Sequence, residues 1–91
     1  MKYEYKQVEN RVVAIDGERE VGEITYADRG DDVWVFNHTY VNPSHRGGGV
    51  AGGLLQALVD EAIKQGKKIH PTCSFVVRAF EANPEYQKLQ V

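Results

Sequence analysis

One stretch decides how this sequence folds: Pro43-Ser44-His45-Arg46-Gly47-Gly48-Gly49-Val50-Ala51-Gly52-Gly53. It holds five of the nine glycines of the chain and joins a strand-like segment to a helix-like one. Glycine inside a helix costs roughly 1 kcal/mol relative to alanine, so glycines gathered where a helix begins indicate that something approaches the backbone closely. The free N–H groups of a first helical turn attract anions, and the guanidinium of Arg46 suits phosphate oxygens. We therefore expect a phosphate or pyrophosphate site here; the alternative is a flexible loop whose glycines only let it turn.

The residues before this stretch have the pattern of β-strands. Three strands are expected, at Arg11–Ile15, Val21–Tyr26 and Val33–Val41, and the short turns between them predict an antiparallel meander. The third strand is expected at the centre of the sheet, because both of its faces carry large apolar residues. Strict alternation puts four of its side chains on one face, namely Trp34, Phe36, His38 and Tyr40. The terminus around Tyr3, Tyr5 and Lys6 is expected to be frayed.

After the glycine-rich stretch the period changes to that of a helix, which begins near Ala51 and ends at Gly66. Lys67–Cys73 is expected to be a short strand, parallel to Val33–Val41 through a right-handed crossover. Ser74 can cap a last helix over Phe75–Ala82, which Asn83-Pro84 ends. The fold class is therefore α/β: a mostly antiparallel sheet of about four strands, one long helix after the glycine turn and a short C-terminal helix.

Composition limits the other possibilities. The 91 residues suffice for a single domain, 1–91, and a hydrophobic share of 42% with 26% charged residues excludes a disordered, collagen-like or coiled-coil chain. Eleven basic against thirteen acidic residues give a net charge of −2, which argues against nucleic acid or a membrane surface as a partner. The single cysteine, Cys73, and the lack of a leader-like or membrane-spanning segment favour a cytoplasmic protein, expected as a monomer or weak homodimer.

Two common phosphate motifs do not fit. The Walker A pattern fails because no Gly-Lys-Ser/Thr follows the glycines. Gly47, Gly49 and Gly52 match the dinucleotide pattern G-x-G-x-x-G as a string, but three antiparallel strands precede them, and the next strand ends at Thr72-Cys73 without a carboxylate. A metal is not expected either, since the three histidines and Cys73 do not have a recognisable zinc spacing.

The segment Val41 to Leu55 resembles motif A of the GCN5-related N-acetyltransferases (GNAT), whose core is Arg/Gln-x-x-Gly-x-Gly/Ala. The core matches Arg46, Gly49 and Ala51. A small single-domain GNAT-like subfamily is similar over most of the chain, from roughly Val13 to Leu89. Its further matching segments are His38-Thr39-x-Val41, Pro71-x-Cys73-x-Phe75 and Asn83-Pro84-x-Tyr86. The chain departs from larger members in its short length and in lacking their catalytic glutamate at the end of the central strand.

The resemblance implies a minimal GNAT-like fold and acetyl-CoA as cosubstrate. In the family, backbone amides of the glycine turn hold the pyrophosphate, which here implies Arg46, Gly47, Gly48, Gly49, Val50 and Ala51. The pantetheine arm pairs with the end of the central strand, which here implies Thr39, Tyr40 and Val41. Asn83 and Tyr86 are expected either to contact coenzyme A or to pack in the core. For Tyr86 the resemblance leaves a further alternative, an acid that protonates the leaving thiolate, as a tyrosine does in many members of the family. His45 is expected to be a solvated loop histidine, with contact to a phosphate as the alternative.

His38 and Cys73 are the candidates for catalysis, because the resemblance places both at the acetyl carbonyl, between the ends of the strands 33–41 and 67–73. His38 can act as the base that deprotonates an amine, or it is a core histidine bonded to a carbonyl. Cys73 precedes a helix, whose N-terminus can lower the pKa of a thiol. It is an acyl acceptor, a wall of the thioester pocket or a small buried residue.

The function expected from these residues is transfer of an acetyl group from acetyl-CoA to an amine. Because the chain is short, the acceptor site is expected to be open, which favours an exposed protein or peptide amine. The alternative is a non-catalytic acetyl-CoA-binding module or sensor. A third interpretation, nucleic-acid binding, requires a basic face that the composition does not supply.

Overall fold

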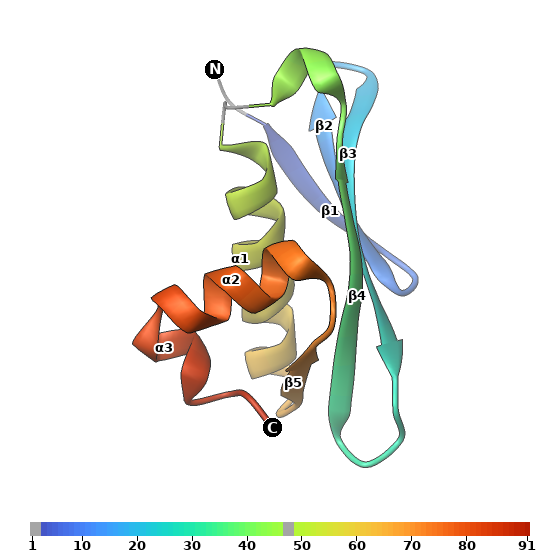
Figure 1. Ribbon diagram of the computed structural model, residues 1–91. Coiled ribbons are helices and arrows are strands. Elements are labelled where there is room, and N and C mark those ends of the chain that lie inside the picture. Colours follow the sequence, from blue (N-terminus) through green and yellow to red (C-terminus); the bar gives the residue numbers. More distant parts are fainter. Residues whose placement is uncertain (1–2, 47–48) are drawn as a thin grey trace.

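The computed structural model describes residues 3–46 and 49–91 as one five-stranded sheet with helices on one of its faces (Figure 1). The strands lie in the order β1 (Glu4–Val8), β2 (Arg11–Asp16), β3 (Arg19–Asp28), β4 (Val33–Val41) and β5 (Lys68–Pro71). The first four are antiparallel, and β5 is parallel to β4. The helices are a 3₁₀ turn η1 (Pro43–His45), α1 (Val50–Lys64), α2 (Ser74–Ala82) and α3 (Pro84–Gln87).

The expected α/β architecture is confirmed, with five strands where about four were predicted. The N-terminal residues were expected to be frayed, but Glu4–Val8 pairs with β2 along its whole length. Tyr5 explains why β1 forms: its ring lies over Gly53 of α1, where any side chain would overlap the tyrosine hydroxyl. Gly53 therefore serves the contact between β1 and α1, and not the approach of a ligand that its place in the glycine-rich stretch suggested.

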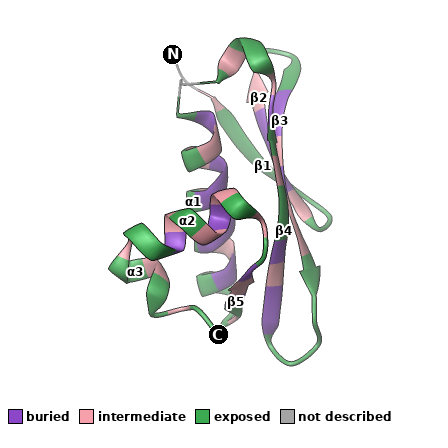
Figure 2. Cartoon of the chain, in the orientation of Figure 1, coloured by how far each residue is buried: buried purple, intermediate pink, exposed green. Residues whose placement is uncertain are grey.

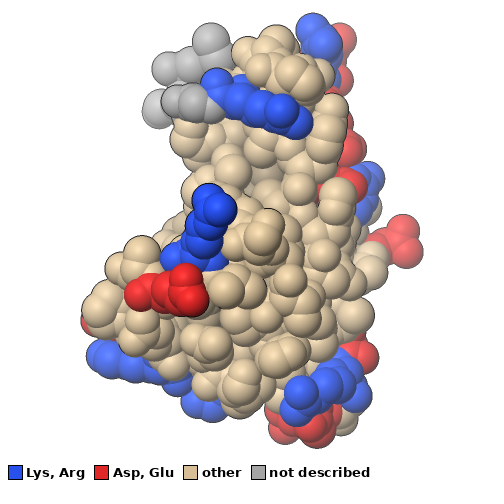
Figure 3. Space-filling model, viewed as in Figure 1, with Lys and Arg blue, Asp and Glu red and all other residues tan. Residues whose placement is uncertain are grey.

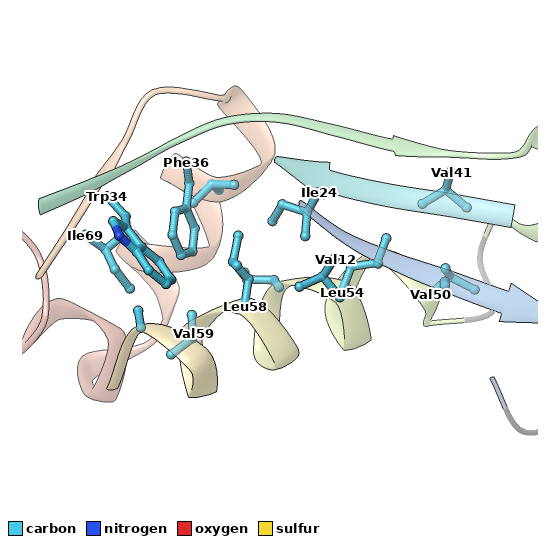
Figure 4. Packing of buried hydrophobic residues seen from close by; sticks show 14 of the residues in the cluster. Val12, Ile24, Trp34, Phe36, Val41, Val50, Leu54, Leu58, Val59 and Ile69 are labelled. Atoms are coloured by element: carbon cyan, nitrogen blue, oxygen red, sulfur yellow. The ribbon is translucent and has the colours of Figure 1, made fainter. Parts of the chain in front are cut away.

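The apolar stripe of α1 faces the sheet, as its period predicts. Leu54 and Leu58 are fully buried against Ile24, Trp34 and Phe36, and Figure 4 shows these side chains meeting between helix and sheet. Burying a leucine side chain stabilises the fold by about 1.5–3 kcal/mol. The burial pattern in Figure 2 follows this layer, with buried residues on the inner side of α1. This layer holds α1 in a fixed position over β3 and β4.

A bulge in β4 changes which of its side chains face α1. Thr25 of β3 pairs with His38, but Tyr26 pairs with Phe36, so Asn37 is an extra residue in β4. Before the bulge, Phe36 points into the core; after it, Thr39 and Val41 are the side chains on the helix face. His38 and Tyr40 point to the opposite face. The prediction that His38 shares a face with Trp34 and Phe36 is wrong, because it assumed strict alternation through position 37.

The described residues place no helix on this opposite face, which we call the open face (Figure 1). Within residues 3–46 and 49–91, none of the helices combines the length and apolar character needed to span a bilayer.

Gly22 sets how closely α1 approaches the sheet. A Cβ atom at this position would lie 3.0 Å from the carbonyl oxygen of Tyr40 and 3.1 Å from Cδ1 of Leu54. We predict that Gly22→Val lowers the free energy of unfolding by about 1–3 kcal/mol, since the added methyl groups push α1 off the sheet. Urea unfolding measures this. The control is Gly52→Ala, where a Cβ meets no atom within 4 Å, and which should leave stability equal or raise it by up to about 1 kcal/mol. An equally or more stable Gly22→Val protein would contradict the prediction.

Candidate functional site

Strands β4 and β5 separate after a short pairing, at a place we call the β4–β5 fork. Their register ends where Phe36 lies beside Pro71. The N–H groups of Thr72 and Cys73 then both donate to the carbonyl oxygen of Phe36, at 3.1 and 3.3 Å, and turn the chain into α2. The edge of β4 beyond Phe36 therefore has no pairing with β5.

Cys73 lies at this fork as the N-cap of α2, the position that the sequence assigned to Ser74. Its Sγ is 3.7 Å from Oγ1 of Thr39, on the helix face of β4. Burial raises the pKa of the Cys73 thiol, but hydrogen bonds from the N–H groups of Val76 and Phe75 and from Thr39 outweigh it, so the pKa lies below its ordinary value. These bonds stabilise the thiolate, which is the nucleophilic form of cysteine.

The second feature of the site is the N-terminus of α1. Gly49 is its N-cap, in the left-handed conformation with φ of +82°, and it provides no side-chain hydrogen bond to the first turn. A pocket of about 280 Å³ lies here, lined by Val41, His45, Arg46, Gly49, Val50, Ala51 and Gly52. Such a helix end presents backbone donors to an anion. Gly47 and Gly48, which were also predicted to bind the pyrophosphate, lie outside the described residues.

Arg46 and His45 border this pocket and are both tied to the sheet. The Nε of Arg46 donates to the carbonyl oxygen of Val41 at 3.2 Å, which connects its guanidinium to the end of β4. Nε2 of His45 lies 3.1 Å from Oδ2 of Asp16, and its Nδ1 lies 3.0 Å from Oγ of Ser44. The His45 side chain is only 15% exposed, so the expectation of a solvated loop histidine is wrong. Asp16, which sequence spacing did not single out, holds it.

The molecular surface beside the N-terminus of α1 is concave. In Figure 3 it is hollowed beside the upper part of α1 and above α2; Lys or Arg side chains lie above and below the hollow, and Asp or Glu side chains adjoin the lower ones. Basic side chains around a concave surface favour an anionic ligand.

His38 lies on the open face and not beside the Cys73 side chain. Its imidazole is 52% exposed, and Nε2 lies 3.4 Å from Oε2 of Glu23 on β3. The structure therefore brings His38 and Cys73 to the same end of the β4–β5 pairing but on different faces of β4. The alternative of a buried core histidine is wrong; a role as base stays a prediction.

Asn83 and Tyr86 do not line the pocket at the start of α1. They border a second pocket of about 450 Å³ between α1 and α3. Oδ1 of Asn83 accepts from the N–H of Glu85 at 3.0 Å and caps α3. The Tyr86 hydroxyl donates to Oε1 of Gln56 at 2.8 Å, and its ring packs against Phe80. Both side chains thus have packing or capping roles, and contact with coenzyme A stays a prediction.

Among the residues that the structure describes, no group of three or more His, Cys, Asp or Glu side chains gathers in a way that could hold a metal ion.

Comparison with known proteins identifies the family. The sequence model of the GCN5-related N-acetyl-transferases matches residues 4–89. The chain belongs to the GNAT family. The glycine-rich stretch of this GNAT domain lies between β4 and α1, and motif-A residues Arg46, Gly49 and Ala51 line the pocket there. The resemblance inferred from the sequence is thereby confirmed.

Relatives with known names or structures agree with this assignment. Protein NATD1 of Gallus gallus and that of Homo sapiens are each 28% identical to the GNAT domain over 78 residues, which cover 86% of this chain and 71% and 69% of theirs. A GCN5-like protein of Staphylococcus aureus, solved by NMR, superimposes with a TM-score of 0.77 at 32% identity, covering 97% of this chain and 87% of that one.

A ribosomal-protein-alanine N-acetyltransferase from Brucella melitensis biovar Abortus 2308 superimposes with a TM-score of 0.64 at 22% identity, over 89% of this chain and 59% of that one. At this identity the likeness concerns the fold alone.

We predict that Thr39→Val raises the pH at which Cys73 reacts with iodoacetamide, because the thiolate of this GNAT domain loses a hydrogen bond. Near neutral pH the alkylation rate should fall severalfold, and mass spectrometry over a pH series measures it. Thr72→Val is the control, since the Thr72 hydroxyl donates to the carbonyl oxygen of Phe36 at 3.2 Å. Identical pH profiles for Thr39→Val and the wild type would show that Thr39 does not act on the thiol.

Proposed function

We propose that this GNAT domain binds acetyl-CoA and transfers its acetyl group to an amine. One observation carries the proposal: the unpaired edge of β4 runs from the thiol of Cys73 at the β4–β5 fork to the uncapped N-terminus of α1. From Asn37 to Val41 this edge is about 13 Å long, at 3.3 Å per residue. Coenzyme A has the same order of groups, with a thioester at one end, an amide-bearing arm and a pyrophosphate beyond it.

The residues at the α1 end suit the pyrophosphate. The N–H groups of Val50 and Ala51 belong to the first turn of α1, which has no acidic residue to compete for them. Arg46 adds a guanidinium beside them, and Gly47 and Gly48 complete the proposed set. Backbone groups of Thr39, Tyr40 and Val41 would pair with the amides of the arm, as an added strand does.

The fork end suits the thioester. Its carbonyl would lie before α2, whose first N–H groups already act on the sulfur of Cys73 and can polarise a carbonyl oxygen. Two routes are open from there. In direct transfer, the amine attacks the carbonyl and His38 removes a proton from it. In the other route, the thiolate of Cys73 attacks first, coenzyme A leaves as its thiolate, and the amine then takes the acetyl group from Cys73.

The acceptor that we propose is an exposed amine of a protein or peptide. The position of His38 supports this, because half of its side chain is exposed on a face of the sheet that no described helix covers. A folded surface or an extended peptide can reach such a base. The matching experiment compares peptide amines with small metabolite amines as acceptors at equal concentration. Efficient turnover of small metabolites alone would contradict the peptide class.

We predict that Gly49→Val weakens acetyl-CoA binding by roughly tenfold or more, because a β-branched side chain both strains the left-handed N-cap and obstructs the amides. Titration calorimetry measures the affinity. The matched control is Gly66→Val at the other end of α1, where φ is +72° and a Cβ likewise meets no atom within 4 Å. It carries similar backbone strain away from the pocket and should bind normally. Equal affinity of the two variants would remove α1 from the binding site.

Whether the acetyl group passes directly to the amine or through Cys73 is tested separately, by mass spectrometry after mixing the protein with acetyl-CoA. We predict an acetyl adduct on the wild-type protein that is absent from Cys73→Ser if Cys73 is the acyl acceptor. Release of free coenzyme A in the presence of amine, without any adduct, assigns direct transfer. Tight binding with neither adduct nor release over all acceptors would contradict an enzyme and leave a binding module.

A further inference from the structure

Four side chains form a network across the open face of the sheet, one from β2, two from β3 and one from β4. Nη1 of Arg11 donates to Oε1 of Glu23 at 2.7 Å and to Oε2 of Glu20 at 2.9 Å, while Nη2 reaches the other oxygen of Glu20 at 3.4 Å. The second oxygen of Glu23 lies 3.4 Å from Nε2 of His38. The Glu23 carboxylate therefore joins Arg11 to His38, using one oxygen for each.

Glu23 is held more firmly than His38. Its side chain is 27% exposed and is anchored by Arg11, whereas the His38 side chain is 52% exposed. His38 reaches this face because of the bulge at Asn37, whose Oδ1 accepts a hydrogen bond from Oγ1 of Thr25. In the described part of the chain, Glu23 has the one carboxylate within 4 Å of a ring nitrogen of His38. An anchored carboxylate next to an exposed imidazole can select the orientation and the tautomer of the ring.

We infer that Glu23 is a positioning residue for His38 and that the acceptor amine approaches from the open face. With its carboxylate oxygen 3.4 Å from Nε2, Glu23 favours the proton on that nitrogen, which leaves the lone pair of the neutral ring on Nδ1. This inference rests on the proposed function and names the group that prepares its base.

The proton balance is simple. As the bond between the amine nitrogen and the acetyl carbon forms, the bond from that carbon to sulfur breaks and the electron pair leaves on sulfur. Nδ1 of His38 takes the proton that the nitrogen loses, and the negative charge of Glu23 stabilises the resulting imidazolium. The proton then returns to solvent or to the thiolate that leaves.

The test compares Glu23→Ala with Glu20→Ala. Both variants remove a carboxylate that Arg11 contacts, but only Glu23 contacts His38, so Glu20→Ala controls for the loss of charge and of the Arg11 bond. The ¹⁵N shifts of the imidazole at alkaline pH report the tautomer. We expect Nε2–H to dominate in the wild type and in Glu20→Ala, and both tautomers to be populated in Glu23→Ala.

With a peptide amine as acceptor, kcat of Glu23→Ala should fall about tenfold while KM for acetyl-CoA stays the same, and Glu23→Gln, which keeps an acceptor oxygen, should recover part of the loss. Amide spectra verify that each variant is folded. An unchanged tautomer or an unchanged kcat in Glu23→Ala would overturn the inference. A tautomer that changes in Glu23→Ala but not in Glu20→Ala, in a protein that turns over no amine, would contradict the proposed function while confirming the contact between Glu23 and His38.

Discussion

The carbonyl oxygen of Phe36 accepts three hydrogen bonds, from the N–H groups of Thr72 and Cys73 and from the Thr72 hydroxyl. This one acceptor ends the pairing of β4 with β5 and turns the chain into α2 at the same point. Two properties of the site depend on it. The edge of β4 beyond Phe36 is left without a neighbouring strand, and Cys73 is fixed at the end of a helix whose N–H groups act on its sulfur.

The bulge at Asn37 follows immediately and divides the site between the two faces of the sheet. In a regular strand that alternated through Asn37, His38 would point at α1 and Thr39 would point away from Cys73. With the bulge, the hydroxyl of Thr39 reaches the thiol, and the imidazole of His38 joins the charged network of the open face. The bulge thus decides that Thr39, and not His38, is the side chain that faces the sulfur.

Sequence reasoning succeeded where the signal is local. The period of the apolar residues predicted α1, and the turns predicted the meander. The glycine-rich stretch adjoins a pocket at the start of α1, and its binding of a pyrophosphate stays a prediction. Sequence reasoning failed where a residue's position depends on a contact with a residue that is distant in the sequence. Nothing near Tyr5 shows that it packs on Gly53, and the residues Asp16 and His45 pair across 29 positions. The face on which His38 lies was predicted wrongly, because the bulge arises from the pairing of β4 with β3 and cannot be recognised from the alternation of apolar and polar residues in β4.

The contact between Tyr5 and Gly53 connects the N-terminus of the chain to the ligand end of α1. Gly53 donates its N–H to the carbonyl oxygen of Gly49, so the residue under the tyrosine ring is one helical turn from the N-cap. The contact with β1 and the pocket therefore share the first turn of α1. Under the proposed function, displacing β1 from α1 would therefore disturb the helix end that is proposed to bind the pyrophosphate.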